Sequence, residues 1–166
     1  MKPIDTERLI IRPFLETDLE DLYNLLSNPE VMKYYPNPLN KKGAKEWMER
    51  NWKRQQEFGH SLWAIIRKKD RLFVGQCGLI TQDVEGEDMV EIGYMIRNDL
   101  WRQGYAIEAI NGVLSFASIE LKLQEVVALI DPQNGPSMQV ALRAGFTEKK
   151  AVRKWDKDLL LFSKTL

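Results

Sequence analysis

The chain has 166 residues, 44% of them hydrophobic and 29% charged, a composition typical of one folded domain with a substantial core. Lys and Arg number 24 and so do Asp and Glu, and this balance, without a basic stripe, argues against a nucleic-acid binder. Because Cys77 is the only cysteine and no apolar run approaches membrane-spanning length, we expect one cytoplasmic domain over 1–166, without a disulfide and without a membrane partner.

The first part of the chain predicts one strand and two helices. Residues 8–14 have strand composition, and residues 17–20 (Thr-Asp-Leu-Glu) match a capping box ahead of apolar residues at helical spacing. A stiff loop rich in Tyr and Pro follows over 33–40. A second helix is expected over 42–58, and Gly59 ends it.

The remainder alternates strands with two more helices. Strand-like runs cover 61–67, 71–80, 89–96 and 125–130, an acidic loop covers 84–88, helices are expected over 106–116 and 136–144, and two closing strands flank 155–158. The order is therefore β-α-α-β-β-β-α-β-α-β-β. It indicates an antiparallel meander followed by crossovers.

The most informative segment is a loop that leads directly into the helix expected over 106–116. Its residues are Trp101, Arg102, Gln103, Gly104, Tyr105 and Ala106. The first N–H groups of a helix have no internal partner, and the helix dipole is positive at that end. Because Gly104 lets the backbone approach a ligand closely, the loop suits a pyrophosphate. Taken alone, the loop fits an ordinary strand-to-helix turn equally well.

Four stretches are informative through their order and spacing: TERLIIRP at 6–13, EIGY at 91–94, WRQGYAIEA at 101–109, and a segment from NGPS to AGF over 134–146. Together they resemble the GNAT superfamily of acyl-CoA-dependent N-acetyltransferases, and within it the Rim-type branch that acetylates the N-termini of ribosomal proteins. The resemblance covers nearly the whole chain. It departs at Trp101, where the family often has Gln or Arg. It implies an α+β fold with a mixed, mostly antiparallel seven-stranded sheet, splayed in the middle and flanked by about four helices.

The resemblance also implies acetyl-CoA as cosubstrate and no metal. The loop from Trp101 to Ala106 would offer backbone N–H groups to the CoA pyrophosphate, and Asn134 would bond the pantetheine. Met95 and Ile96 would pair with the pantetheine arm as an added strand, and a backbone N–H near them would stabilise the oxyanion. The acetyl group would pass directly to a primary amine, without a covalent acyl-enzyme.

Two side chains are candidates for proton transfer. Glu91 is the candidate general base, acting directly or through water, and the alternative is a solvated or Arg-paired strand carboxylate. Ser137 is placed to hydrogen-bond the departing thiolate, and the alternative is a serine that caps a helix beside Pro136. A Cys–His pair from Cys77 and His60 is disfavoured, because free cysteines within apolar strands pack as small hydrophobes.

The amine acceptor is left open by the sequence. Tyr34 and Tyr35, in the proline-rich loop, are candidates for acceptor contact, whereas Trp47 and Trp52 are expected on the core face of the second helix. The resemblance favours the N-terminal amine of a protein. A small amine (an amino acid, polyamine or antibiotic) and a non-catalytic acyl-CoA-binding domain are the alternatives. Either a monomer or a homodimer is compatible with the sequence.

Overall fold

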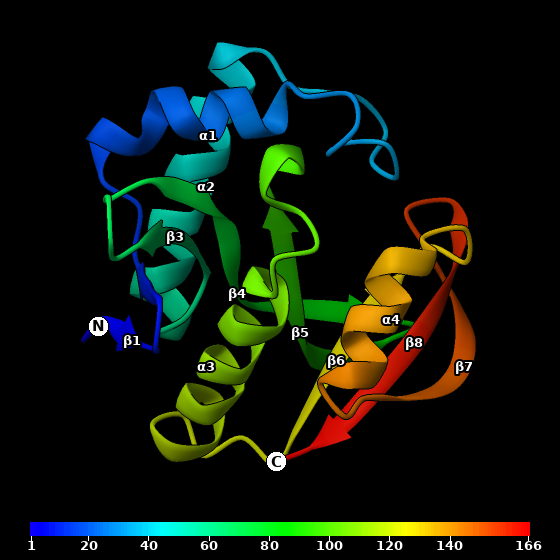
Figure 1. Cartoon of the computed structure of the whole chain (residues 1–166). Helices are drawn as coiled ribbons and strands as arrows, with labels where there is room; N and C mark the ends of the chain where they lie inside the picture. Colours follow the sequence, from blue (N-terminus) through cyan, green and yellow to red (C-terminus); the bar gives the residue numbers. More distant parts are fainter.

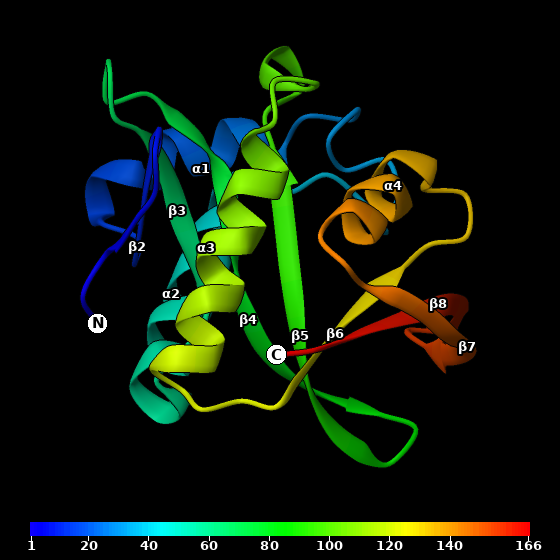
Figure 2. The ribbon, with the colours of Figure 1, turned by 60° about the horizontal axis from the view of Figure 1, so that its bottom comes forward.

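The computed structural model describes residues 1–166, which form one mixed sheet with helices on both faces (Figure 1, Figure 2). The strands are β1 (Ile4–Asp5), β2 (Leu9–Arg12), β3 (Leu62–Arg67), β4 (Phe73–Val84), β5 (Glu87–Ile96), β6 (Glu125–Ile130), β7 (Thr147–Lys154) and β8 (Lys157–Thr165). The helices are α1 (Leu19–Leu26), α2 (Lys41–Phe58), α3 (Tyr105–Ile119) and α4 (Gly135–Arg143), with 3₁₀ turns η1 (Glu16–Asp18) and η2 (Asn98–Leu100). None of these helices combines the length and apolarity that crossing a bilayer requires.

The sheet has eight strands in the order β1-β2-β3-β4-β5-β6-β8-β7. All neighbours are antiparallel except β5 and β6, which are parallel. The mixed, mostly antiparallel sheet and its four helices are as predicted, but the predicted count of seven strands was one short. The additional strand is β1, whose two residues pair with Ile10 and Ile11 and are too few to show a pattern in the sequence.

The sheet is splayed between β5 and β6. Their pairing is limited to Glu91 opposite Val127, whereas β4 and β5 remain in register from Gly75 opposite Ile96 to Val84 opposite Glu87. Beyond Glu91, β5 continues to Ile96 without a partner on its β6 side. Figure 1 shows the two strands diverging toward the loop that precedes α3. This gap divides the sheet into a β1–β5 half and a β6–β8 half.

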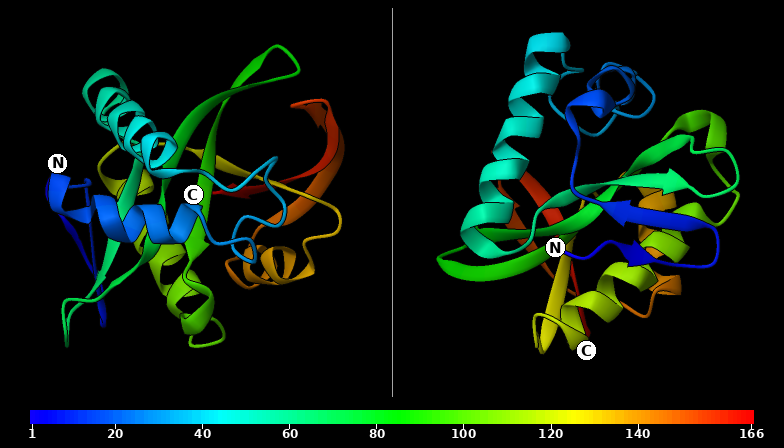
Figure 3. Two further views of the ribbon diagram at one scale, coloured as in Figure 1. Left: turned by 90° about the horizontal axis from the view of Figure 1, so that it is seen from above. Right: turned by 90° about the vertical axis from the view of Figure 1, so that its left-hand side faces the viewer.

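The two larger of the three apolar cores lie on opposite faces of the sheet. One packs α3 and α4 against strand residues such as Ile92 and Ile96, and the other packs α1 and α2 against residues that include Met95. Figure 3 shows α2 and α3 on opposite sides of the strands. Because side chains alternate along β5, Glu91 shares the α1–α2 face with Met95, and Tyr94 shares the α3–α4 face with Ile92 and Ile96.

Two local predictions were wrong. Thr17 does not cap α1: the η1 turn comes first, and the carboxylate of Asp18 accepts the Leu15 N–H at 2.7 Å and pairs with Arg12 at 2.6 Å. The acidic residues 84–88 do not form a loop either, because β4 and β5 continue through them into a hairpin. Its two-residue turn, Glu85–Gly86, has positive φ at both positions, as the twist of a tight hairpin requires.

Candidate active site

The backbone of β5 offers hydrogen-bonding groups to the gap at alternate residues. The Arg97 N–H donates to the Val74 carbonyl at 2.9 Å, which fixes the phase of the β4–β5 ladder. Because ladder bonds alternate along an antiparallel pair, the backbone of Met95 faces Gln76, and the backbones of Tyr94 and Ile96 face the gap. This phase makes Tyr94 and Ile96, rather than Met95, the sources of backbone groups for a molecule held in the gap.

Trp101 ties the start of the loop before α3 to the end of β5. Its indole N–H donates to the Ile96 carbonyl at 2.8 Å, while 47% of the residue stays exposed. The carbonyl of Ile96 is therefore occupied within the chain, and its N–H is the remaining backbone donor at the end of the strand. The side chain of Trp101 thus connects the loop to the end of β5, and the backbone N–H groups that follow it in the loop remain without partners in the chain.

The loop before α3 presents an unbroken run of unsatisfied backbone donors. No acceptor in the chain receives the six N–H groups from 102 to 107. Gly104, with φ 79°, is the N-cap residue of the 15-residue helix α3, and Arg102 also has a positive φ of 61°. Left-handed residues within the loop turn successive N–H groups toward a common point, and the helix dipole makes that point positive. The arrangement fits an anion such as a pyrophosphate.

Glu91 is a buried carboxylate at the closed end of the gap, where β5 still pairs with β6. It is 9% exposed, and its Oε2 accepts a hydrogen bond from the Gln82 side chain at 3.0 Å. Burial raises the pKa of Glu91 to about 7, and it outweighs the opposing effects of Gln82, Lys154, the Leu129 backbone and Arg54. The predicted alternative of a solvated or Arg-paired carboxylate does not fit, because the ion pairs of the structure do not include Glu91. A carboxyl group that titrates near neutrality is suited to accept a proton.

On the other face, Tyr94 and Ser137 connect the two halves of the sheet. The Tyr94 hydroxyl lies 2.9 Å from the Ser137 carbonyl oxygen and 2.8 Å from Ser137 Oγ. Burial raises the pKa of Tyr94 to about 12, so the hydroxyl remains protonated and able to donate. The cap of α4 is Asn134, whose Oδ1 accepts the Ser137 N–H at 3.2 Å. The serine is therefore held by Tyr94 and is not itself the helix cap.

Tyr94 was given no role by the sequence reasoning, although it lies within the EIGY stretch. The alternation of side chains along a strand puts Tyr94 on the face opposite Glu91. That placement was the one feature of the sequence that could have indicated a role for Tyr94 on the other side of the sheet. What the sequence did not show is that α4 returns to the same face. Because Tyr94 and Ser137 are 43 residues apart, their contact depends on the crossover through α3 and β6.

The loop between α1 and α2 reaches across the gap. Tyr34 donates its hydroxyl hydrogen to the Gln133 carbonyl at 3.1 Å. Lys157 of β8 donates to the Tyr34 carbonyl at 3.1 Å and to the Asp131 carboxylate at 2.8 Å. Figure 1 shows this loop extending from α1 toward the β7–β8 hairpin. A segment of the β1–β5 half is thereby fastened to the β6–β8 half on the side that Glu91 faces.

Tyr35, the second predicted acceptor residue, is 44% exposed. Burial, followed by the charges of Glu91 and Tyr94, raises the pKa of its hydroxyl to about 12. The Tyr34 hydroxyl is instead bonded to the Gln133 carbonyl.

The remaining candidates are structural. Trp47 and Trp52 pack against the α1–α2 core, and their indole N–H groups donate to Gln76 at 3.0 Å and to the Phe14 carbonyl at 2.8 Å. Cys77 is fully buried, which raises the pKa of its thiol far above neutrality. His60 is buried too, with Nδ1 lying 3.0 Å from the Leu79 carbonyl oxygen.

The chain is similar over most of its length to a family model and to known proteins. A family model described as an acetyltransferase (GNAT) domain matches residues 8–147. The protein YkkB of Bacillus subtilis (strain 168) is 36% identical over 160 residues, which cover 96% of this chain and 93% of YkkB. The family-model match includes β5 and β6, which border the gap, together with the Gly104 loop and α4.

Solved structures agree with the fold over its whole length. An acetyltransferase (GNAT family) from Bacillus anthracis superposes with a TM-score of 0.85 at 25% identity and covers 98% of each chain. RimL, a ribosomal L7/L12 alpha-N-protein acetyltransferase solved in complex with coenzyme A, superposes with a TM-score of 0.80. That match covers 99% of this chain and 98% of RimL, and at 14% identity it supports the fold alone. The predicted resemblance to the GNAT superfamily is confirmed, and the structural neighbours include Rim-type enzymes.

Proposed function

This chain belongs to the GNAT acetyltransferase family, and we propose that it transfers an acetyl group from acetyl-CoA directly to the α-amine at the N-terminus of a peptide or protein. The observation that carries the proposal is a buried glutamate, Glu91, with a pKa raised to about 7 beside an open gap in the sheet. The free backbone donors before α3 supply the second element, a place for the cofactor phosphates.

The residues present fit acetyl-CoA. The six free N–H groups and the positive end of α3 would hold the pyrophosphate, and the gap-facing backbone of Tyr94 and Ile96 would pair with the pantetheine arm. In capping α4, Asn134 uses only its side-chain oxygen, which accepts the Ser137 N–H. Its NH₂ group is therefore free to bond the same arm. When bound, acetyl-CoA supplies a thioester carbonyl as electrophile and a thiolate as leaving group.

Glu91 would take the proton of the attacking amine, directly or through one water. A peptide α-amine has a reference pKa of about 7.7–8.0 and a lysine amine one of about 10.4. A base that titrates near 7 is therefore well matched to an α-amine, whereas a lysine would leave several pKa units to overcome. The N–H of Ile96 lies beyond the last β5–β6 pairing and would donate to the thioester oxygen as negative charge develops there.

Ser137 and Tyr94 would act on the leaving group from the α3–α4 face. The Tyr94 hydroxyl hydrogen has two acceptors in reach, the Ser137 carbonyl oxygen at 2.9 Å and Ser137 Oγ at 2.8 Å. Donation to Oγ would back the hydrogen bond that Ser137 gives to the departing sulfur. A thiolate is a good leaving group, with a reference pKa of about 8.5 for the cysteine thiol. The serine therefore assists the departure and is not indispensable to it.

The acceptor assignment is tested by comparing amines at one pH. The test measures thiol release from acetyl-CoA with a lysine-containing peptide that has a free N-terminus, the same peptide with its N-terminus blocked, and the polyamine spermidine. The proposal predicts turnover with the free N-terminus and little with the other two. Turnover with spermidine alone would instead assign the protein to the small-amine class. Turnover of the blocked peptide would assign it to lysine side chains.

A further inference from the structure

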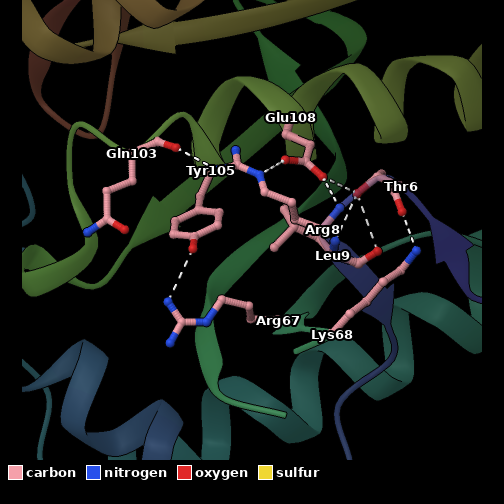
Figure 4. Close-up of polar contacts among 8 residues, drawn as sticks. All are labelled: Thr6, Arg8, Leu9, Arg67, Lys68, Gln103, Tyr105 and Glu108. Atoms are coloured by element: carbon pink, nitrogen blue, oxygen red, sulfur yellow. Dashed lines mark hydrogen bonds and ion pairs between the residues drawn. The ribbon is translucent and has the colours of Figure 1, made fainter. Parts of the chain in front are cut away.

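Arg8 connects the segment before β2 to the loop before α3 (Figure 4). Its backbone N–H donates to Glu108 Oε1 at 2.7 Å, and its Nε donates to Glu108 Oε2 at 2.6 Å. Its Nη1 donates to the Gln103 carbonyl oxygen at 2.9 Å. The guanidinium also lies over the Tyr105 ring, 4.5 Å from its centroid. A single residue therefore contacts the loop, the first residue of α3 and the first turn of that helix.

The partners of Arg8 are themselves held in place. Thr6 Oγ1 donates to Glu108 Oε1 at 2.6 Å, so the carboxylate has a second donor from the N-terminal segment. Arg67 Nη1 donates to the Tyr105 hydroxyl at 3.1 Å, which fixes the ring from its other end (Figure 4). A planar guanidinium group can hold several neighbours in place, because it can donate to two acceptors and stack on an aromatic ring at the same time.

The bond from Arg8 to Gln103 also sets the direction of a neighbouring donor. In a trans peptide, the carbonyl of one residue and the N–H of the next point in opposite directions. The Gln103 carbonyl is drawn toward Arg8, so the N–H of Gly104 must point to the opposite side. That N–H is one of the free donors of the loop and has no acceptor in the chain. Without Arg8, this peptide would be free to rotate about its flanking dihedral angles.

We infer that Arg8 is a positioning residue for the cofactor: it holds the Gln103–Gly104 peptide so that the Gly104 N–H faces the pyrophosphate of acetyl-CoA. The inference rests on the proposed function, since it assigns a role within the same cofactor site. In this inference Arg8 acts through the loop, by its bond to the Gln103 carbonyl, and not through a direct contact with the cofactor. Glu108 anchors the guanidinium, and Gln103 is the group that the guanidinium orients.

The test uses the whole chain and the variants Arg8→Gln, Arg8→Lys and Thr6→Val. Lysine keeps the charge beside Glu108 but has no second nitrogen for Gln103. Thr6→Val removes a Glu108 contact and leaves the Gln103 bond intact, which makes it the matched control. The dissociation constant for CoA is measured by calorimetry for each, together with that for S-acetylpantetheine, which lacks the pyrophosphate. Backbone amide relaxation of 102–105 is measured by NMR in the absence of any ligand.

We expect both Arg8 variants to weaken CoA binding by roughly tenfold or more, the range of a lost hydrogen bond to a charged group. S-acetylpantetheine binding should stay unchanged, Thr6→Val should bind CoA nearly as the wild type does, and the loop amides should gain mobility in the Arg8 variants without ligand. A direct phosphate contact would leave the ligand-free loop as rigid as in the wild type, and that result would overturn the inference. Equal weakening of both ligands would also overturn it. Failure of the wild type to bind CoA would instead contradict the proposed function.

Discussion

Tyr94 of β5 and Ser137 of α4 form a hydrogen bond across the gap in the sheet, with 2.8 Å between their hydroxyl oxygens. Glu91, on the same strand, points to the opposite face because it lies three positions before Tyr94 and side chains alternate along a strand. The gap therefore has two hydroxyl groups on the side of α3 and α4 and a buried carboxyl group with a raised pKa on the side of α1 and α2. Under our proposal the thiol leaves toward the first side and the amine enters from the second.

The Tyr94→Phe variant should lower kcat about three- to tenfold and leave the KM for acetyl-CoA nearly unchanged. Phenylalanine keeps the packing but removes the donor that supports Ser137, a contribution of about 1 kcal/mol. Steady-state kinetics on Tyr94→Phe, Ser137→Ala and the double variant would check this. Because the two residues act as one unit, the double variant should be no worse than Ser137→Ala. Fully additive losses would show that they act independently.

Replacing Glu91 with Gln should reduce kcat/KM for a peptide acceptor by about 100-fold at pH 7, at the lower end of the range for general bases. In the wild type, kcat/KM should rise with pH through about 7, as Glu91 loses its proton. In Glu91→Gln this rise should be replaced by one that follows the pKa of the acceptor amine. Identical pH profiles in the two proteins would rule out Glu91 as the base.

The same carboxylate should make stability depend on pH. Its pKa is raised on folding from 4.5 to about 7, so the folded state binds the extra proton. The stabilisation is fully present below pH 4.5 and is lost as pH rises through about 7, by roughly 3 kcal/mol at about 1.4 kcal/mol for each pKa unit. The unfolding free energy of the wild type minus that of Glu91→Gln, measured in urea between pH 4 and 8, should therefore fall by about this amount as pH rises, because the glutamine does not titrate. A difference that is constant with pH would contradict the raised pKa.

Lys157→Met should weaken acceptor binding without affecting the cofactor. The change removes the contacts of Lys157 with Asp131 and with the Tyr34 carbonyl, which fasten the α1–α2 loop over the gap. We expect the KM for peptide to rise severalfold and the KM for acetyl-CoA to stay constant. Lys42→Met is the matched control, since the Lys42 side chain is 85% exposed at the start of α2. A change in the KM for acetyl-CoA would show that the loop also shapes the cofactor site.

Residue patterns were enough to predict most of the elements and the anion-binding character of the loop before α3, since these depend on local periodicity and on backbone donors at a helix N-terminus. The splay of the sheet was implied only by the resemblance to the GNAT superfamily. The functions of side chains depended on contacts between distant segments. The links of Arg8 to Glu108, Tyr94 to Ser137 and Lys157 to Tyr34 each join residues that no local pattern relates. The raised pKa of Glu91 likewise arises from burial by several elements at once, and the sequence had left this residue open between a base and a solvated carboxylate.

The most direct test of the account is a calorimetric titration of acetyl-CoA into the wild type, Gly104→Asp and Gly59→Asp. Both glycines have a similar φ, 79° and 75°, so the two variants carry a similar backbone strain. A Cβ at residue 104 would lie 3.3 Å from Arg8 Nη2, and its carboxylate would add charge beside the expected pyrophosphate, whereas the space around a Cβ at Gly59 is open. We predict saturable binding to the wild type and Gly59→Asp and none to Gly104→Asp. Absence of binding to the folded wild type, or equal binding to all three proteins, would contradict the assignment of the Gly104 loop as the cofactor site.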